Sequence, residues 1–583
     1  MTATALALLA AMTAPAMVGP DEPLADFLLE AADGSRHSLY AEQPGRALTV
    51  LAFTGVECPI TRKLAPRLGR LEREWRGRGV RFLGIDPNLQ DDADEVAQFA
   101  RDAQIDFPIL LDPQQRVTDR LEVERTTEVF LLDGDFRVIY RGAVDDQYSV
   151  GASRPAPLND FLIAAMEAAL AGETIDPDRT EAPGCLVGRL NRKDADADVT
   201  FHRDVAPILF RHCAECHRPG QAGPMSLLDA ETAAGFAPMI AEVTGSGRMP
   251  PWHASARFGH FLNERRLTET ETRLLELWAA SGAKLGDPAD APPAPTFPSG
   301  DWSIGTPDLV VELPEPQPIP ATGVVPYRYV IVDPQLDAER FVDAIEIAPT
   351  APSATHHVMV FLLEPGQSPQ QALQSPASLE GRNHFAQHVP GGRPLVLAEG
   401  RARRLAAGSR FLFQLHYTPD GKEASDRTRM ALRFTRAAPT HEVVARTVMN
   451  MSFVIPPHAD AATVEASSAI VAPTRLLSAM PHMHLRGKSF RLLLERGGES
   501  RLLLDVPRFD FEWQHTYEFA QPIELQAGDA LRMVAVFDNS SANPANPDPA
   551  KSVRFGEQTF EEMAVAYLHL ELPIAAAKAA SAR

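Results

Sequence analysis

Histidine and methionine side chains with the chemistry of metal ligands are grouped in the C-terminal half of this 583-residue chain. Five are histidines in the motifs Thr-His-His-Val-Met, Gln-Leu-His-Tyr and Met-Pro-His-Met-His, and the sixth is a methionine in Glu-Glu-Met. The six side chains are His356, His357, His416, His482, His484 and Met563. Imidazole suits copper, zinc and iron, whereas a thioether favours a soft monovalent ion such as Cu(I). The ligand types therefore predict two copper ions, one held by three imidazoles and the other by two imidazoles and a thioether.

The spacing of these residues predicts the strands that present them. Residues two apart in a strand point to the same face, so His482 and His484 would lie side by side. His416 lies in a β-rich apolar run, Phe411–Tyr417. The neighbours in the Thr-His-His motif would point to opposite faces of a regular strand. They can reach one ion only at a strand end or at a β-bulge.

These motifs resemble those of the copper type II, ascorbate-dependent monooxygenases, the family of peptidylglycine α-hydroxylating monooxygenase and dopamine β-monooxygenase. The resemblance runs from about Asp301 to Leu572. It implies two consecutive all-β jelly-roll domains with one copper on each, facing across a solvent-filled cleft. It also implies that the three-imidazole copper stores electrons and that the copper held with Met563 meets dioxygen. The implied reaction inserts one oxygen atom into a C–H bond of a small molecule or peptide.

The substrate contacts of the peptide-amidating branch are mostly missing. That branch grips a substrate carboxylate with an Arg, an Asn and a Tyr, which align here with Met480, Val565 and Tyr567. Only Tyr567 is retained, so we expect it to join the two histidines and Met563 in the catalytic site. Because the guanidinium–carboxylate pair is absent, a peptide ending in glycine is not the expected substrate.

A second motif, Cys213-Ala-Glu-Cys216-His217, has the spacing of a c-type haem attachment site. Both thiols would bind the porphyrin and His217 would be an axial ligand. The flanking segments, Phe201–Leu209 and 267–282, have helical patterns, so we expect a small all-α cytochrome c domain. A zinc knuckle or a simple thiol pair is the alternative, but no second cysteine pair lies nearby.

The second axial ligand of the haem has three candidates. Met249, in Met-Pro-Pro, resembles the distal methionine of mono-haem cytochromes c, and His253 and Met225 are the alternatives. Methionine ligation would raise the haem potential, which suits electron delivery to the three-imidazole copper. The haem would then replace or supplement ascorbate as the electron donor.

The N-terminal region alternates predicted strands and helices, with Cys58 at a strand-to-helix turn. This pattern resembles the thioredoxin-like redoxins and their peroxiredoxin relatives, with an α/β fold. Thr61 stands where a Cys-x-x-Cys motif has its second cysteine, so no local disulfide can form. A thiol at a helix N-terminus has a lowered pKa, and Cys185 is the remaining free partner. The domain is therefore either redox-active or a degenerate redoxin that only docks.

Length predicts three to five domains, separated by proline-rich or polar stretches. We expect a signal peptide (1–18), a redoxin domain (20–173), a linker (174–198), a cytochrome c domain (199–285), a proline-rich linker (286–304) and two copper domains (305–440 and 441–575). The net charge of −21 argues against nucleic-acid partners, and no apolar stretch is long enough to span a membrane.

The signal-like N-terminus and the covalent haem motif predict a periplasmic or secreted protein. Its predicted function is copper-dependent hydroxylation with dioxygen, driven by the haem, by ascorbate or by a redox protein. Two alternatives from other classes remain. One is a copper-binding electron carrier or copper sensor without hydroxylase activity, and the other is a cytochrome-coupled thiol peroxidase that uses Cys58.

Overall fold

The computed structural model describes residues 22–40, 47–188, 197–297, 302–374 and 383–574. The chain forms two compact units, one of residues 1–146 and 159–192 and the other of residues 147–158 and 193–583. No helix in the described ranges is both long and apolar enough to cross a membrane. The predicted signal peptide lies outside the described residues.

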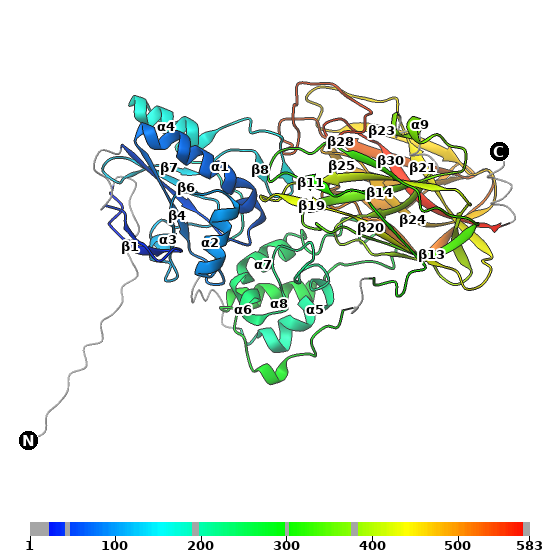
Figure 1. Cartoon of the computed structure of the whole chain (residues 1–583), viewed down its shortest axis with the longest axis horizontal. Helices are drawn as coiled ribbons and strands as arrows, with labels where there is room; N and C mark the ends of the chain where they lie inside the picture. The colour runs from blue at the N-terminus through cyan, green and yellow to red at the C-terminus, as the bar shows by residue number, and fades with distance from the viewer. Residues whose placement is uncertain (1–21, 41–46, 189–196, 298–301, 375–382, 575–583) are drawn as a thin grey trace, which may run out of the picture. The chain divides into compact units, whose positions relative to one another are not determined.

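The first unit is an α/β domain built on one seven-stranded sheet (Figure 1). The strand order is β2-β1-β5-β4-β3-β6-β7, in which the β3–β4 and β4–β5 pairs are parallel. Strands β3 and β4 are buried along their whole length, which explains why β3 is apolar at every position except Thr49. The strands are β1 (Leu28–Ala31), β2 (Arg36–Ser38), β3 (Leu48–Phe53), β4 (Val80–Asp86), β5 (Ile109–Leu111), β6 (Val129–Leu132) and β7 (Val138–Gly142), and the helices are α1 (Pro59–Trp75), α2 (Ala93–Asp102), α3 (Arg116–Arg120) and α4 (Phe161–Ala171).

The described part of the predicted linker packs on this unit. The Thr126 N–H donates to the Cys185 carbonyl at 3.0 Å, and the Val187 N–H donates to the Glu124 carbonyl at 2.9 Å. These bonds bring Cys185 to the N-terminal end of α1, where Cys58 is the N-cap residue.

Four short helices follow in the second unit: α5 (Ala206–His212), α6 (Ala230–Gly235), α7 (Ala237–Gly245) and α8 (Glu269–Ala280). A π-helical turn, Phe201–Val205, precedes α5, and a capping box between Thr268 and Glu271 starts α8. Trp278 and Leu275 of α8 are fully buried against this turn and α5. Both helical segments predicted from the sequence are therefore confirmed.

The remainder of the second unit is β-rich (Figure 1). A nine-stranded sheet has the order β10-β20-β13-β17-β21-β30-β24-β27, with β16 beside β13, and two four-stranded sheets have the orders β12-β18-β14-β15 and β23-β28-β25-β26. The strands of the first half are β10 (Leu309–Glu312), β11 (Gln317–Ile319), β12 (Arg328–Val332), β13 (Arg340–Ala348), β14 (Thr355–Leu363), β15 (His384–His388), β16 (Leu395–Val396), β17 (Arg401–Leu405), β18 (Arg410–Tyr417), β19 (Ala424–Asp426) and β20 (Arg429–Phe434), with helix α9 (Pro369–Gln374) between β14 and β15. Those of the second half are β21 (His441–Met449), β22 (Val454–Ile455), β23 (Ala462–Ala469), β24 (Thr474–His482), β25 (Gly487–Arg496), β26 (Glu499–Val506), β27 (Tyr517–Leu525), β28 (Ala530–Phe537), β29 (Val553–Arg554) and β30 (Val565–Pro573).

The nine-stranded sheet runs through both predicted copper domains. The junction is a short parallel pairing of β17 with β21, in which Arg401 lies opposite His441 and Ala402 opposite Glu442. Each half has its own apolar core, and the core of the second half also takes in Trp252 and Phe261 from the segment that follows α7. The two β-sandwiches are thus joined by backbone hydrogen bonds as well as by side-chain packing.

Candidate metal centre

Three predicted ligands meet on two neighbouring strands of the first β-sandwich. His356 and His357 belong to β14 and His416 to β18. One ligand atom from each ring can be chosen so that all three lie within 4.8 Å of one another, and the Nδ1 atoms of His356 and His416 are 3.0 Å apart. Nδ1 of His357 has no hydrogen-bond partner among the described residues. The three imidazoles therefore form a group that could hold a metal ion through Nδ1 atoms.

A β-bulge allows adjacent histidines to share this site. Thr355 pairs with Tyr417 and His357 with His416, so the register of β14 and β18 shifts between Thr355 and His357. The extra residue, His356, is accommodated on the same side as its neighbour. The geometric condition set by the Thr-His-His motif is thus met.

Burial favours the uncharged form of His357 and His416. His357 is 1% exposed, and burial followed by the nearby imidazoles of His416 and His356 lowers its pKa well below the ordinary value. The pKa of His416 is lowered in the same way, first by burial and then by His356. Neutral imidazole is the form that binds a metal ion.

The second predicted group lies at the end of β24. The rings of His482 and His484 are 5.2 Å apart between centroids, and both side chains are buried. His482 Nδ1 lies 2.5 Å from Gln514 Oε1, which can only accept, so Nδ1 carries the proton and Nε2 is the free ligand atom. His484 Nδ1 similarly faces the Glu561 carbonyl at 3.3 Å, and its Nε2 has no hydrogen-bond partner in the described ranges.

Met563 lies just before β30, the strand that pairs with β24. In this antiparallel pairing His482 lies opposite Val565, two residues after Met563. Glu562 fixes this alignment, because its carboxylate accepts the N–H groups of His484 at 2.8 Å and Arg486 at 2.6 Å. Burial raises the pKa of Glu562 to about 7, although these bonds act in the opposite direction.

The two groups are neighbours rather than being separated by solvent. The ring centroids of His357 and His482 are 6.3 Å apart. Phe511 stacks on His356 at 4.7 Å and lies 6.2 Å from His484, while all five imidazoles are buried. The expectation of a solvent-filled cleft is therefore wrong for this structure, because aromatic and apolar side chains occupy the space.

The positions that align with the substrate contacts of the peptide-amidating branch lie in this apolar filling. Met480 and Val565 are buried in a cluster that also contains Met563 and Tyr567. Tyr567 lies opposite Met480 in the strand pairing, and its ring is 5.9 Å from that of His482. Tyr567 is thus close to the second group, and no cation occupies the position of Met480.

One loop supplies residues that the sequence motifs did not indicate. Between β26 and β27, Phe511 stacks on His356, the Glu512 carboxylate lies 3.6 Å from His356 Nε2, and Gln514 bonds to His482. On the other side, the ring of Tyr327 lies 4.6 Å from that of His416. No ligand-like spacing marks these residues, because they reach the histidines only through tertiary folding.

Gln514→Leu tests the importance of this loop. Without the amide oxygen, the proton on His482 is no longer held on Nδ1, so we expect metal affinity at the second group to fall by about 10- to 100-fold. Titration of the purified protein with Cu(I) in the presence of a competing chelator measures this. The exposed Gln526→Leu is the control, and equal affinities for the two variants would contradict the assignment.

The predicted haem motif lies after α5. Cys213 and Cys216 are both free and partly exposed, and burial together with the neighbouring Cys216 raises the pKa of Cys213 to about 12. Burial lowers the pKa of His217, whose Nδ1 has no hydrogen-bond partner within the described part of the chain. Gly223 packs so tightly here that a Cβ atom would lie 2.8 Å from the His217 ring.

The candidates for the distal haem ligand lie in different surroundings. Met225 and Cys213 both pack against the helical core. Met249 follows α7, and its N–H donates to the Val243 carbonyl at 2.9 Å. His253 is buried on the second β-sandwich, where burial, followed by Arg508, lowers its pKa to about 4. Of the three, Met225 is the one that packs against the same core as Cys213.

In the first unit, Cys58 and Cys185 are in contact. The Cys185 N–H donates to Cys58 Sγ at 3.4 Å, and both residues are buried. Burial raises the pKa of Cys58, but hydrogen bonds from Cys185, Thr126 and Thr61 outweigh it and lower the pKa to about 5. Cys58 is therefore a thiolate at neutral pH, with a second cysteine against it.

Two family models match separate parts of the chain. Residues 20–144 match the AhpC/TSA family, and residues 443–576 match the copper type II ascorbate-dependent monooxygenase, C-terminal domain. The first match includes Cys58, and the second includes His482, His484 and Met563. The chain thus contains a thioredoxin-like domain and a β-rich copper monooxygenase domain, both from oxidoreductase families.

One curated protein and several solved structures are similar to parts of this chain. The thiol-disulfide oxidoreductase ResA of Bacillus subtilis (strain 168) is 26% identical over 121 residues, which cover 21% of this chain and 64% of that protein's length. Among solved structures, an uncharacterized conserved protein from Geobacillus kaustophilus is 26% identical, with 30% of this chain and 92% of that chain covered and a TM-score of 0.25. A hypothetical protein from Sinorhizobium meliloti 1021 is 25% identical, with 29% of this chain and 94% of that chain covered and a TM-score of 0.26.

Proposed function

We propose that this protein is a copper-dependent monooxygenase that hydroxylates a C–H bond of an organic substrate with dioxygen. The observation that carries the proposal is the meeting of two histidine groups, one of three imidazoles and one of two imidazoles near the start of β30. The C-terminal family match supports copper as the metal. The groups differ in ligand chemistry, as two ions with different tasks require.

The residues fit copper at both groups. At the first, His356, His357 and His416 would bind through one ring nitrogen each; the Nδ1 atoms of His356 and His416 lie 3.0 Å apart, and Nδ1 of His357 has no hydrogen-bond partner among the described residues. At the second, Gln514 and the Glu561 carbonyl hold Nδ1 protons, which leaves the Nε2 atoms for the metal. Met563 would add a thioether that favours the monovalent state.

Bound copper would supply one-electron redox chemistry and a site for dioxygen. The protein's own residues exclude water, because Phe511 and the apolar cluster around Met563 bury both groups. Glu562 and Arg486 hold the His-x-His segment against the start of β30. Tyr567, beside His482, would orient the substrate.

We further propose that electrons arrive through a haem c attached at Cys213 and Cys216, with ascorbate or a redox protein as donor. His217 fits an axial ligand, because its ring is neutral and Nδ1 is unpartnered within the described residues. A periplasmic or secreted location follows from covalent haem attachment. Met225 and Met249 remain the methionine candidates.

The haem assignment predicts a covalent chromophore. Purified protein should show the narrow visible bands of low-spin haem, and the colour should stay with the polypeptide after denaturation in acid acetone. Cys213→Ala with Cys216→Ala should release or lose the haem, whereas Cys185→Ala should not. Wild-type protein without bound haem would remove the cytochrome from the proposal.

The central experiment combines metal content with oxygen uptake. Two coppers per chain and dioxygen consumption that depends on an added organic substrate, with one hydroxylated product per dioxygen, are the expected result. Two bound coppers with no substrate-dependent uptake over a broad set of compounds would favour the copper carrier or sensor instead.

A second function is supported by the cysteine contact in the first unit. We propose that Cys58 and Cys185 exchange electrons with a dithiol or disulfide of a partner protein. The Cys58 thiolate attacks the partner disulfide, and Cys185 then displaces the partner thiol, so that one disulfide forms while another is reduced. The short distance from the Cys185 N–H to Cys58 Sγ supports this pairing over a degenerate domain.

The lowered pKa of Cys58 gives a pH-dependent prediction. The pKa of Cys58 is about 5 in the folded chain, against an ordinary value of 9.0 for a thiol, so the stabilisation by the thiolate is complete above pH 9 and is lost as pH falls toward 5. We expect the unfolding free energy of the reduced protein to rise with pH across this window. Cys58→Ser should flatten that rise, as measured by urea denaturation at several pH values. Identical pH profiles would contradict a folded-state thiolate.

A further inference from the structure

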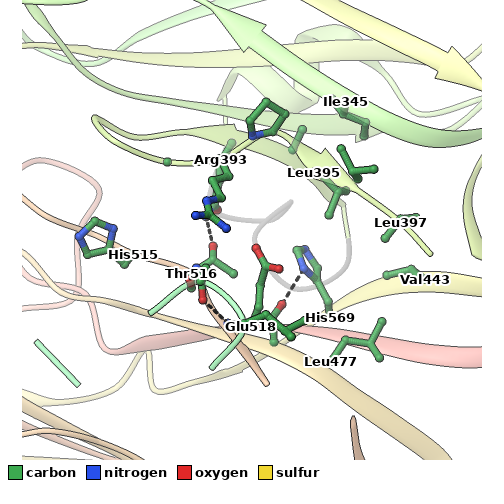
Figure 2. A pocket seen from close by; sticks show the side chains of 18 of the residues that line it. Ile345, Arg393, Leu395, Leu397, Val443, Leu477, His515, Thr516, Glu518 and His569 are labelled. Carbon is green, nitrogen blue, oxygen red and sulfur yellow. Dashed lines mark hydrogen bonds between the residues drawn. The ribbon is translucent and has the colours of Figure 1, made fainter. Parts of the chain in front are cut away.

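A cavity of about 310 Å³ lies within the second unit, beside the metal centre. Figure 2 shows Leu395, Leu397 and Val443 on one side of it and Arg393 with His515 on the other. Such a volume suits a small organic molecule. The mixture of apolar and polar lining is typical of a ligand site rather than of a packing defect.

Unpartnered imidazole nitrogens face this cavity. His384 is 2% exposed, lines the cavity, and has no hydrogen-bond partner at either ring nitrogen among the described residues. His569 stacks on it with centroids 6.1 Å apart, bonds through Nδ1 to Ser478 Oγ at 2.9 Å, and leaves Nε2 without a described partner. A buried polar group without a partner is costly, and a ligand that supplies one would remove this cost.

A neutral imidazole both donates and accepts, so its complement is a hydroxyl or similar group. Burial holds His384 and His569 in this neutral form, because it lowers the pKa of both. These rings therefore favour an uncharged hydrogen-bonding group at the inner end of the cavity.

The rim of the cavity carries charge. Arg393 is exposed, whereas the other lining arginines are already paired, Arg265 with Glu215 at 3.4 Å and Arg401 with Glu571 at 3.1 Å. Glu518 also faces the cavity, and burial raises the pKa of its carboxyl group while Arg393 counteracts this. Arg393 is thus the cation available to an incoming carboxylate.

We propose that this cavity binds a small carboxylic acid with an apolar body and a hydroxyl group. The carboxylate pairs with Arg393, the body lies on Leu395, Leu397 and Val443, and the hydroxyl reaches the imidazoles of His384 and His569. The ligand would contact the loop that holds the metal-binding groups, since Thr516 and His515 line the cavity next to Gln514. The ring of Tyr567 lies 4.9 Å from His384 and 5.9 Å from His482, so one aromatic layer separates the ligand from the metal centre.

Binding can be measured without turnover. Trp252 lines the cavity, so titration of the full-length protein with 3-(4-hydroxyphenyl)propionate should change tryptophan fluorescence saturably, with one site by calorimetry. We expect Arg393→Gln to weaken binding at least tenfold and Arg501→Gln, an exposed arginine elsewhere on the β-region, to leave it unchanged.

Two analogues test each end of the ligand. The alcohol 2-(4-hydroxyphenyl)ethanol lacks the carboxylate. It should bind wild type more weakly than the acid does, and the two compounds should bind Arg393→Gln with equal affinity. Phenylpropionate lacks the hydroxyl. It should bind wild type more weakly than 3-(4-hydroxyphenyl)propionate does, whereas the two acids should bind His384→Phe with equal affinity. No saturable binding to wild type, or unchanged binding by Arg393→Gln, would overturn the proposal. Because no metal or oxygen is involved, its failure is distinguishable from failure of the monooxygenase proposal.

Discussion

His416→Ala is expected to reduce the copper content from two ions per chain to one and to reduce hydroxylation by at least about 100-fold. Loss of a residue that hydrogen-bonds to a metal ligand typically lowers metal affinity or activity by about 10- to 100-fold, and loss of a ligand itself should lower them by at least as much. His416 is the member of the first group that comes from β18, so its loss leaves only the adjacent pair on β14. Metal analysis after dialysis and oxygen-electrode assays measure the two effects.

His388→Ala is the matched control for this substitution. His388 lies in β15 of the same four-stranded sheet, opposite Val358 of β14, and it is not part of the three-imidazole group. It should retain two coppers and near-normal turnover. Loss of copper from both variants would indicate general damage to the sheet, and full copper content in His416→Ala would refute the first site.

Met563→Leu is expected to reduce the rate of hydroxylation by about 100-fold or more. It should leave the fold and the copper at the three-imidazole group intact. Leucine conserves the volume of methionine at this buried position, so the cost in stability should be below about 1.5 kcal/mol. The thioether is lost, and with it the preference of the second group for Cu(I). Oxygen uptake, product formation and Cu(I) affinity should fall together.

Met533→Leu controls for the loss of a buried methionine. Met533 is fully buried in β28, in the core of the second β-sandwich and in a different sheet from the histidine pair. Its variant should behave as wild type. If Met563→Leu retained hydroxylation and Cu(I) affinity, Met563 would be a core residue and the second site would lack its thioether.

The sequence predicted the placement of the histidines on strands where that placement depends on local pattern. A His-x-His pair in a strand has a fixed orientation, and the Thr-His-His motif required a bulge that the register of β14 and β18 contains. The α/β domain and the helices around Cys213 also followed from local periodicity. These features depend on residues close together in the chain.

Other features depend on tertiary contacts and could not be predicted. Phe511 and Gln514 reach the histidines from a loop whose residues have no ligand spacing. The filled space between the two groups, which replaced the expected cleft, results from packing of Met480, Met563 and Tyr567 against the first sandwich. The sequence indicates Cys185 as a partner for Cys58, but the contact between them depends on the return of the chain to α1.

The pairing of β17 with β21 has a mechanical consequence. Because this ladder continues one sheet through both sandwiches, the two halves cannot swing apart as on a hinge without breaking backbone hydrogen bonds such as that from the His441 N–H to the Gly400 carbonyl. The spacing of the two histidine groups is then set by a rigid frame. An electron passing between ions held there would tunnel over a short, constant gap, so its rate should not depend on solvent viscosity.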